Sequence, residues 1–354
     1  MKKIIFASIA LALTACNESN EPQKGAEIDS AVIDYTAENA EAWGNYMVQV
    51  SSLLKNDAQT LIDSWTTGGY SAQFKALAPF DCVEQMIDGM ADIANEVCTA
   101  KIGDPYNLYM SGDTKRALYA VESWYSWHSR DDYANNIRSI RNSFNGTLDG
   151  TVDEESLAAM VDPTLSSEVA AAISAAESAI LAIPQPFRSN ITSTESRAAM
   201  TACADLEELL SVSLKNAARK LSETQLRRIS DRFVDAVVIP TYTELAARNS
   251  ALHQAVQALR DNPTDAGFAT ACNAWLEARE PWEKSEAFLF GPVDALGLDP
   301  NMDSWPLDQD AIVQILTSGN FSGLSGNSEA VQSVRGFHTL EFLLFKDGKP
   351  RTVK

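Results

Sequence analysis

Two residues near the carboxyl end of the chain have types and a spacing that suit metal binding. His338 and Glu341 are three positions apart in the stretch RGFHTLEFLLF, residues 335–345. Residues three apart lie on one face of an α-helix, so the imidazole and the carboxylate could share a divalent metal or hydrogen-bond to each other. The surrounding residues are strongly apolar, and polar groups in such a core need partners. Mutual pairing without a metal is the structural alternative, because metal sites usually need a third protein ligand.

The elements that must position this pair are predicted to be helices. Apolar residues recur every three to four positions along most of the chain, as on the buried face of an amphipathic helix. No stretch shows the sustained alternation that is typical of strands, so the predicted fold class is all-α. The main predicted helices cover residues 28–55, a stretch that begins near Pro79, and residues 114–145, 164–182, 194–235, 241–260 and 265–280. Pro240 is expected either to kink a long helix or to separate two helices.

Residues 114–145 mix aromatic and polar side chains. The pattern predicts one long helix, or two helices joined near residue 129. Ser126, Ser129 and Asp132 follow one another at steps of three, which would place them on one helical face. That face can contribute to a site or simply meet water, and the pattern leaves both interpretations open.

The first residues are typical of a bacterial lipoprotein. Two lysines precede a short apolar stretch, and residues 13–16 read Leu-Thr-Ala-Cys, which resembles a lipidation site. We therefore predict a lipoprotein signal peptide at residues 1–15, lipidation of Cys16, a flexible polar tether at 16–26 and a helical domain at 27–354. An ordinary signal peptide is the alternative. Asn17 after the cysteine favours the outer membrane by analogy with enterobacterial sorting, so a protein that faces the periplasm is expected.

The charge and the cysteines restrict the classes of function further. The formal net charge is −20, which argues against nucleic acid as a partner, because phosphate binding needs a basic surface. A surface of this sign is compatible with attracting cations. Four cysteines follow Cys16, namely Cys82, Cys98, Cys203 and Cys272. In an oxidising compartment they allow two disulfides, and the sequence does not select among the three pairings.

Three blocks in the last quarter of the chain resemble a known family. Gly336, His338 and Glu341 match the G-x-H-x-x-E signature of the imelysin family, also classed as M75 peptidases and as iron-regulated periplasmic proteins. The segment AREPWEKSEAFLFGPV at 278–293 is similar to that family's R-x-x-W-x-x-S-E-x-F-x-F-G-P block, and DSWPLD at 303–308 is similar to the block that follows it. A weaker resemblance covers Ser126, Ser129 and Asp132.

The resemblance implies an all-helical fold of two packed bundles. The approximate halves would be residues 27–190 and 191–354. The serine-containing segment precedes the other blocks here, whereas the family's usual order places it after them. Circular permutation of one fold is the simplest explanation of this order, and a pair of helical bundles tolerates it if the termini are close together.

The resemblance also implies a composite site at the junction of the bundles. The expected metal ligands are His338, Glu341 and Glu286, and the residues expected to line the site are Gly336, Arg279, Asp132, Ser126, Ser129 and His128. One imidazole with carboxylates suits iron, zinc or manganese, so the expected cofactor is a divalent metal, iron or zinc. Groups around the ligands would fix their orientation.

Three functions remain open at this stage. The first, which the iron-regulated members imply, is an outer-membrane lipoprotein that binds a metal ion or metal complex and serves iron or metal uptake with a periplasmic protein partner. The second is a metallopeptidase of imelysin type, although the H-E-x-x-H pattern is absent and the enzyme assignment is open. The third is a scaffold in which His338 and Glu341 form a polar cluster without metal.

Overall fold

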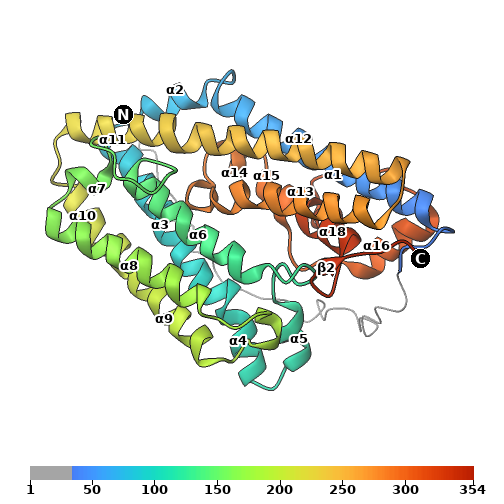
Figure 1. Ribbon diagram of the computed structural model, residues 1–354. Coiled ribbons are helices and arrows are strands. Elements are labelled where there is room, and N and C mark those ends of the chain that lie inside the picture. Colours follow the sequence, from blue (N-terminus) through green and yellow to red (C-terminus); the bar gives the residue numbers. More distant parts are fainter. Residues whose placement is uncertain (1–33) are drawn as a thin grey trace. The chain divides into compact units, whose positions relative to one another are not determined.

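The computed structural model describes residues 34–354, and the predicted signal peptide, Cys16 and tether lie outside this part of the chain. Residues Tyr35–Lys354 form one compact unit. The unit is built from helices, and the described residues hold only one two-stranded hairpin, β1 (Phe345–Lys346) and β2 (Lys349–Pro350) (Figure 1). The predicted all-α fold class is confirmed.

One group of helices brings the two ends of the unit together. Helix α1 (Ala40–Trp65) packs along α12 (Ile239–Asp261), which in turn packs along α13 (Asp265–Glu283), and α18 (Gly336–Leu344) contacts both α1 and α13 (Figure 1). Helix α1 buries the aromatic and apolar positions that recur every three to four residues, Trp43, Tyr46, Met47, Val50, Leu54, Leu61 and Trp65. This apolar face is what holds α1 against the distant α12.

A second group of helices packs around α3 (Pro79–Glu96). Proline at the first helical position suits this start, because its missing N–H would have no partner there. Its neighbours are α6 (Ser129–Asn145), α9 (Thr194–Glu208) and α11 (Glu223–Phe233), and α8 (Pro163–Leu181) joins α6 to α9. The groups meet where α6 contacts α13 and where α3 contacts the 3-10 turn Glu286–Phe288.

The two groups do not coincide with the two halves of the sequence. Helix α1 lies in the group of the C-terminal helices, and α9 and α11 lie with α3. The chain is helical from Glu223 to Asp261, with a π-helical turn at Val234–Val238 that ends two residues before Pro240. Proline has no backbone N–H to donate to a helical hydrogen bond. The wider hydrogen-bonding pattern of a π turn accommodates this missing donor, so Pro240 neither separates two helices nor ends one.

The region 114–145 differs from its predicted form. Helix α5 (Thr114–Tyr119) ends early and α6 begins at Ser129, as the two-helix alternative expects, but residues 120–128 are not helical. We call residues 120–128 the site loop. Ser126 therefore does not share a helical face with Ser129 and Asp132, and that part of the prediction was wrong. Ser123 and Trp127 have φ of 50° and 62°, a conformation that non-glycine residues rarely adopt.

Short elements complete the unit. They are α2 (Tyr70–Lys75), π turn Val97–Lys101, α4 (Gly103–Met110), α7 (Leu157–Met160), 3-10 turn Phe187–Ser189, π turn Leu209–Leu214, α10 (Lys215–Ala218), α14 (Pro292–Ala295), α15 (Leu298–Asp303), α16 (Gln309–Ser318) and α17 (Glu329–Gln332). Among residues 34–354, no helix has the length and apolar character needed to cross a membrane. The four described cysteines are free thiols, so neither of the allowed disulfides is formed.

Candidate metal centre

His338 is placed by the unusual start of α18. Gly336 has φ of +86°, and a Cβ at this position would lie 2.5 Å from the carbonyl oxygen of Met302. Glycine is required on both counts, since it adopts positive φ readily and permits the close backbone approach. The contact seats the first turn of α18 on the end of α15, which carries Asp303. His338 and Asp303 thus meet because a glycine lets two backbones touch.

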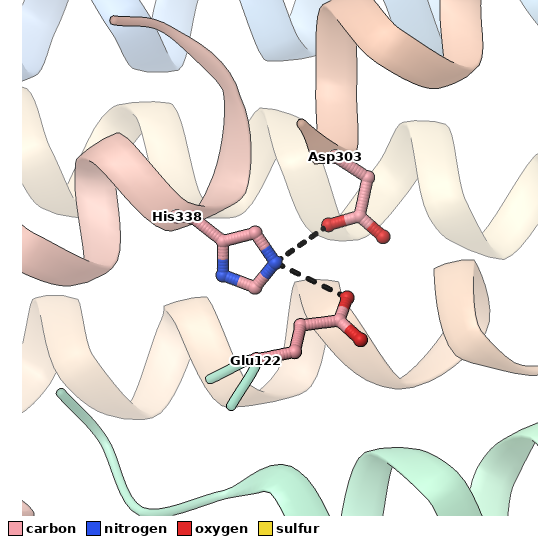
Figure 2. A group of neighbouring side chains, drawn as sticks. All are labelled: Glu122, Asp303 and His338. Atoms are coloured by element: carbon pink, nitrogen blue, oxygen red, sulfur yellow. Dashed lines mark hydrogen bonds and ion pairs between the residues drawn. The ribbon is translucent and has the colours of Figure 1, made fainter. Parts of the chain in front are cut away.

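Both ring nitrogens of His338 face carboxylates, and the ring is fully buried. On one side, Nδ1 lies 2.9 Å from Oε2 of Glu341. On the other, Nε2 lies 3.2 Å from Oε1 of Glu122 and 3.1 Å from Oδ1 of Asp303 (Figure 2). The indole of Trp305 packs edge-on against the imidazole, with ring centroids 4.9 Å apart. Three segments far apart in the sequence therefore converge on Nε2.

These three atoms form a donor set that fits a divalent metal. Each of His338, Glu122 and Asp303 offers one ligand atom, and the three atoms lie within 4.8 Å of one another. Protein ligands lie about 2.0–2.2 Å from zinc, which in a tetrahedral site places neighbouring ligand atoms roughly 3.3–3.6 Å apart. The two distances from Nε2, 3.2 and 3.1 Å, are slightly shorter than this, so a bound ion would require only a small outward shift of the carboxylates. A nitrogen with two carboxylate oxygens suits iron, zinc or manganese. Glu341 on Nδ1 occupies the position in which, at known metal sites, an outer carboxylate orients the histidine ligand.

Arg279 of α13 holds the same carboxylates and lies beside His338, with its Nη2 3.4 Å from Nε2 of the ring. Its guanidinium is fully buried. It bonds to Glu122 at 2.9 Å, to Glu283 at 2.6 Å and to Asp132 at 3.4 Å, and it contacts Asp303 more closely. A planar fork of donors can hold several carboxylates at once. The guanidinium thus fixes the acids in place around His338.

A second buried cation supports Glu122. The ammonium of Lys101, in the π turn at the end of α3, lies 2.9 Å from Oε2 of Glu122. The backbone carbonyl of Glu122 accepts a hydrogen bond from Ser129 Oγ at 2.5 Å. Glu122 is therefore held at its side chain and at its backbone, with Oε1 left to face His338 and Arg279.

The site loop is tied to α18 through Glu341. Oε1 of Glu341 accepts hydrogen bonds from the backbone N–H of Tyr125 at 3.0 Å, from the N–H of Ser126 at 2.7 Å and from Ser126 Oγ at 2.6 Å. The positive φ of Ser123 accompanies a short hydrogen bond from its hydroxyl to Asp132. These contacts account for the unusual loop conformation, since several bonds fix it at once.

The electrostatics of the site reflect an excess of carboxylates. Burial opposes protonation of His338, but hydrogen bonds to Asp303, Glu122 and Glu341 outweigh it and raise the pKa of His338 well above its ordinary value. Burial raises the pKa of Asp132 to about 7 and that of Glu283 to about 8, against the opposing effect of Arg279. For Asp303, burial is outweighed by Arg279 and His338, which lower its pKa to about 2.

The predicted site residues are largely gathered here, in roles that differ from one another. His338 contributes to the donor set, and Glu341 lies at Nδ1, on the nitrogen away from the donor set. Glu286 lies in a neighbouring group with Glu283 and Asp303. Arg279, Asp132, Ser126, Ser129 and Gly336 make the contacts described above, and His128 Nε2 lies 3.7 Å from Oδ1 of Asp132.

The sequence interpretation missed Glu122 and Asp303 as candidate ligands. Asp303 opens the DSWPLD block, so its place in that block was an available signal. Glu122 stands among aromatic residues in a region expected to be helical, and nothing local distinguishes it. Its role depends on the nonhelical site loop.

Comparisons with known proteins agree with this fold. The imelysin family model matches residues 22–213 and 238–354. A crystal structure of an imelysin peptidase from Bacteroides ovatus matches with a TM-score of 0.89 and 54% identity, over 92% of this chain and 100% of that chain. Iron-regulated protein A of Synechococcus elongatus is 38% identical over 118 residues, which are 33% of this chain and 31% of that protein.

The chain thus spans about a third of the length of the curated relative it matches. The predicted circular permutation stays a prediction. The family match covers most of the sequence, and the solved structure shares the helical architecture over nearly the whole chain. The resemblance seen in the motifs is confirmed, and the chain belongs to the imelysin family.

Proposed function

We propose that this protein binds a divalent metal ion, iron or zinc, at His338, Glu122 and Asp303, and that it serves metal uptake as an outer-membrane lipoprotein facing the periplasm. The observation that carries the proposal is the convergence of three donor atoms, with Nε2 of His338 at 3.2 and 3.1 Å from two carboxylate oxygens. The metal is the cargo in this proposal. The similarity to iron-regulated protein A supports iron as the metal.

The contacts of Glu341 favour binding over peptide hydrolysis. A metallopeptidase is the second candidate, because the Bacteroides ovatus relative is an imelysin peptidase. Such an enzyme needs a general base that can reach a metal-bound water. Oε1 of Glu341 already accepts hydrogen bonds from Ser126, and Oε2 faces Nδ1 of His338. The side chain is also fully buried. The contacts of Glu341 therefore position the histidine and the site loop.

The test compares the metal content of matched variants. The full-length protein is purified without affinity metals, incubated with iron or zinc salts, desalted and measured by mass spectrometry. Asp303→Asn keeps the size of a ligand and removes its charge, and Asp310→Asn makes the same change at an exposed position of α16. The proposal expects stoichiometric metal in the wild type and in Asp310→Asn, and a large loss in Asp303→Asn.

Two other results would change the function assigned. Equal or absent metal in all three folded proteins supports the scaffold alternative, in which Arg279 and the carboxylates form a structural cluster. Proteolysis of a peptide mixture that is lost in Asp303→Asn supports the peptidase alternative.

Attachment to the membrane is tested separately with Cys16→Ser, which should abolish fatty-acid labelling and release the protein from the membrane fraction. A partner in uptake would be sought by cross-linking in the wild type.

A further inference from the structure

Next to the donor set lies a second group of acids, and we propose that Glu283, Glu286 and Asp303 form a second cation position, with Asp303 bridging the two. The inference rests on the proposed function, because it makes the site a two-ion site. Glu283 ends α13, Glu286 opens the following 3-10 turn, and Asp303 ends α15. Each offers a carboxylate oxygen, and the three oxygens lie within 4.8 Å of one another.

Glu286 is the observation that points to a ligand. Its side chain is only 8% exposed, and among residues 34–354 its carboxylate makes no hydrogen bond and no ion pair. The nearby ammonium of Lys101 is bonded to Glu122 and Glu96 instead. A buried carboxylate without a partner is costly and rare. A cation held between Glu286 and the two other acids would supply the missing partner.

Glu283 is fixed in an orientation that suits this role. Its Oε2 accepts a hydrogen bond of 2.6 Å from Nδ2 of Asn136, and its Oε1 lies 2.6 Å from Arg279. The side chain is fully buried. A carboxylate oxygen has two lone pairs, so these contacts orient Glu283 without exhausting its capacity as a ligand.

Asp303 belongs to both groups of donors. Its Oδ2 accepts a hydrogen bond of 2.6 Å from the indole of Trp282, and its Oδ1 faces His338. A carboxylate shared by two ions is the usual link in two-metal sites, whose ions lie about 3.5–4 Å apart. The second position is lined by oxygens alone, so it suits harder ions such as Mn²⁺ or Mg²⁺, whereas the histidine-containing position suits zinc and iron as well.

The test counts ions with Mn²⁺ as the probe. Full-length wild-type protein, Glu286→Gln and the control Glu168→Gln are saturated with Mn²⁺, and bound metal is measured per chain. Glu168 is exposed on α8, so the control makes the same change away from the site. We expect two ions in the wild type and in the control, and one ion in Glu286→Gln. Electron paramagnetic resonance should show a coupled, broadened signal in the wild type and the signal of isolated Mn²⁺ in Glu286→Gln.

The outcomes separate this inference from the proposed function. One ion in the wild type, retained in Glu286→Gln, overturns the second position and leaves the first. No bound Mn²⁺ overturns the second position, and the separate measurement with iron or zinc salts then decides the first. Circular dichroism confirms that each variant is folded, and the wild-type count decides the question even if Glu286→Gln fails to fold.

Discussion

Oε2 of Glu341 lies 2.9 Å from Nδ1 of His338, while its other oxygen accepts three hydrogen bonds from Tyr125 and Ser126 of the site loop. One carboxylate thus links the helix that carries the histidine to the loop that carries Glu122. In this arrangement the glutamate of the H-x-x-E pattern orients the histidine and anchors a loop, and the other two ligands of the proposed metal site, Glu122 and Asp303, come from elsewhere in the chain.

Glu341→Gln should weaken metal binding without unfolding the protein. The amide has one acceptor oxygen where the carboxylate has two, so it can accept from the site loop or face Nδ1 of His338, and its NH₂ group then opposes donors at the other position. Loss of such an outer partner usually costs 10–100-fold in affinity, and we expect about that loss by calorimetric titration with Zn²⁺. Metal affinity that stays at the wild-type value would show that Glu341 does not position His338.

Gly336→Ala should destabilise the protein and displace His338 from Asp303. The new Cβ would collide with the carbonyl oxygen of Met302 at 2.5 Å, and φ is +86°. The matched control is Gly319→Ala, where φ is +64° and nothing lies within 4 Å. The control carries only the backbone strain, about 1 kcal/mol, so the larger loss of unfolding free energy and of metal affinity should belong to Gly336→Ala. Equal effects in chemical denaturation would contradict the role assigned to the close approach.

The metal-free protein should lose stability as the pH rises from about 4.5 to about 8. Burial raises the pKa of Asp132 to about 7 and of Glu283 to about 8, so the folded state holds protons that the unfolded state releases. Stability from these groups is present below their ordinary pKa and is lost as the pH rises through the folded pKa. The raised pKa of His338 acts in the same direction. Thermal unfolding with a chelator should give a lower midpoint at pH 8.5 than at pH 5.5.

The control for this pH dependence is Glu283→Gln. The amide keeps the shape of the side chain and removes one of the titrating groups, so the midpoint should change less between the two pH values. A wild-type midpoint that rises over the same interval, or a variant with the full wild-type slope, would show that these buried acids are not protonated in the folded state.

Arg279→Met should be strongly destabilising, because it leaves several buried carboxylates without their cation. Removing one partner of a buried ion pair costs about 3–5 kcal/mol. Arg248→Met is the comparison, since Arg248 pairs with Glu244 and Glu277 at the surface, where such pairs contribute about 0–1 kcal/mol. Urea denaturation of both variants measures the difference. An equal loss in the two proteins would mean that the carboxylates around Arg279 are solvated or protonated.

The sequence predicts several helices closely and the site only in part, and the helix expected at 194–235 is interrupted between Ala218 and Glu223. Apolar periodicity is a local signal, and α8, α13 and α18 lie within a few residues of their expected bounds. The site loop is held by contacts to Glu341, more than 200 positions away. The positive φ of Ser123 accompanies its hydrogen bond to Asp132, and apolar periodicity gives no signal of such polar contacts. Glu122 was missed for that reason.

The most direct test of the metal centre is a crystal of the full-length protein soaked with Zn²⁺ and measured at the zinc absorption edge. The account predicts an anomalous peak about 2.0–2.2 Å from Nε2 of His338, with Glu122 and Asp303 as the other protein ligands and Glu341 still on Nδ1. An absent peak, or a peak only at sites away from these three residues, would contradict it.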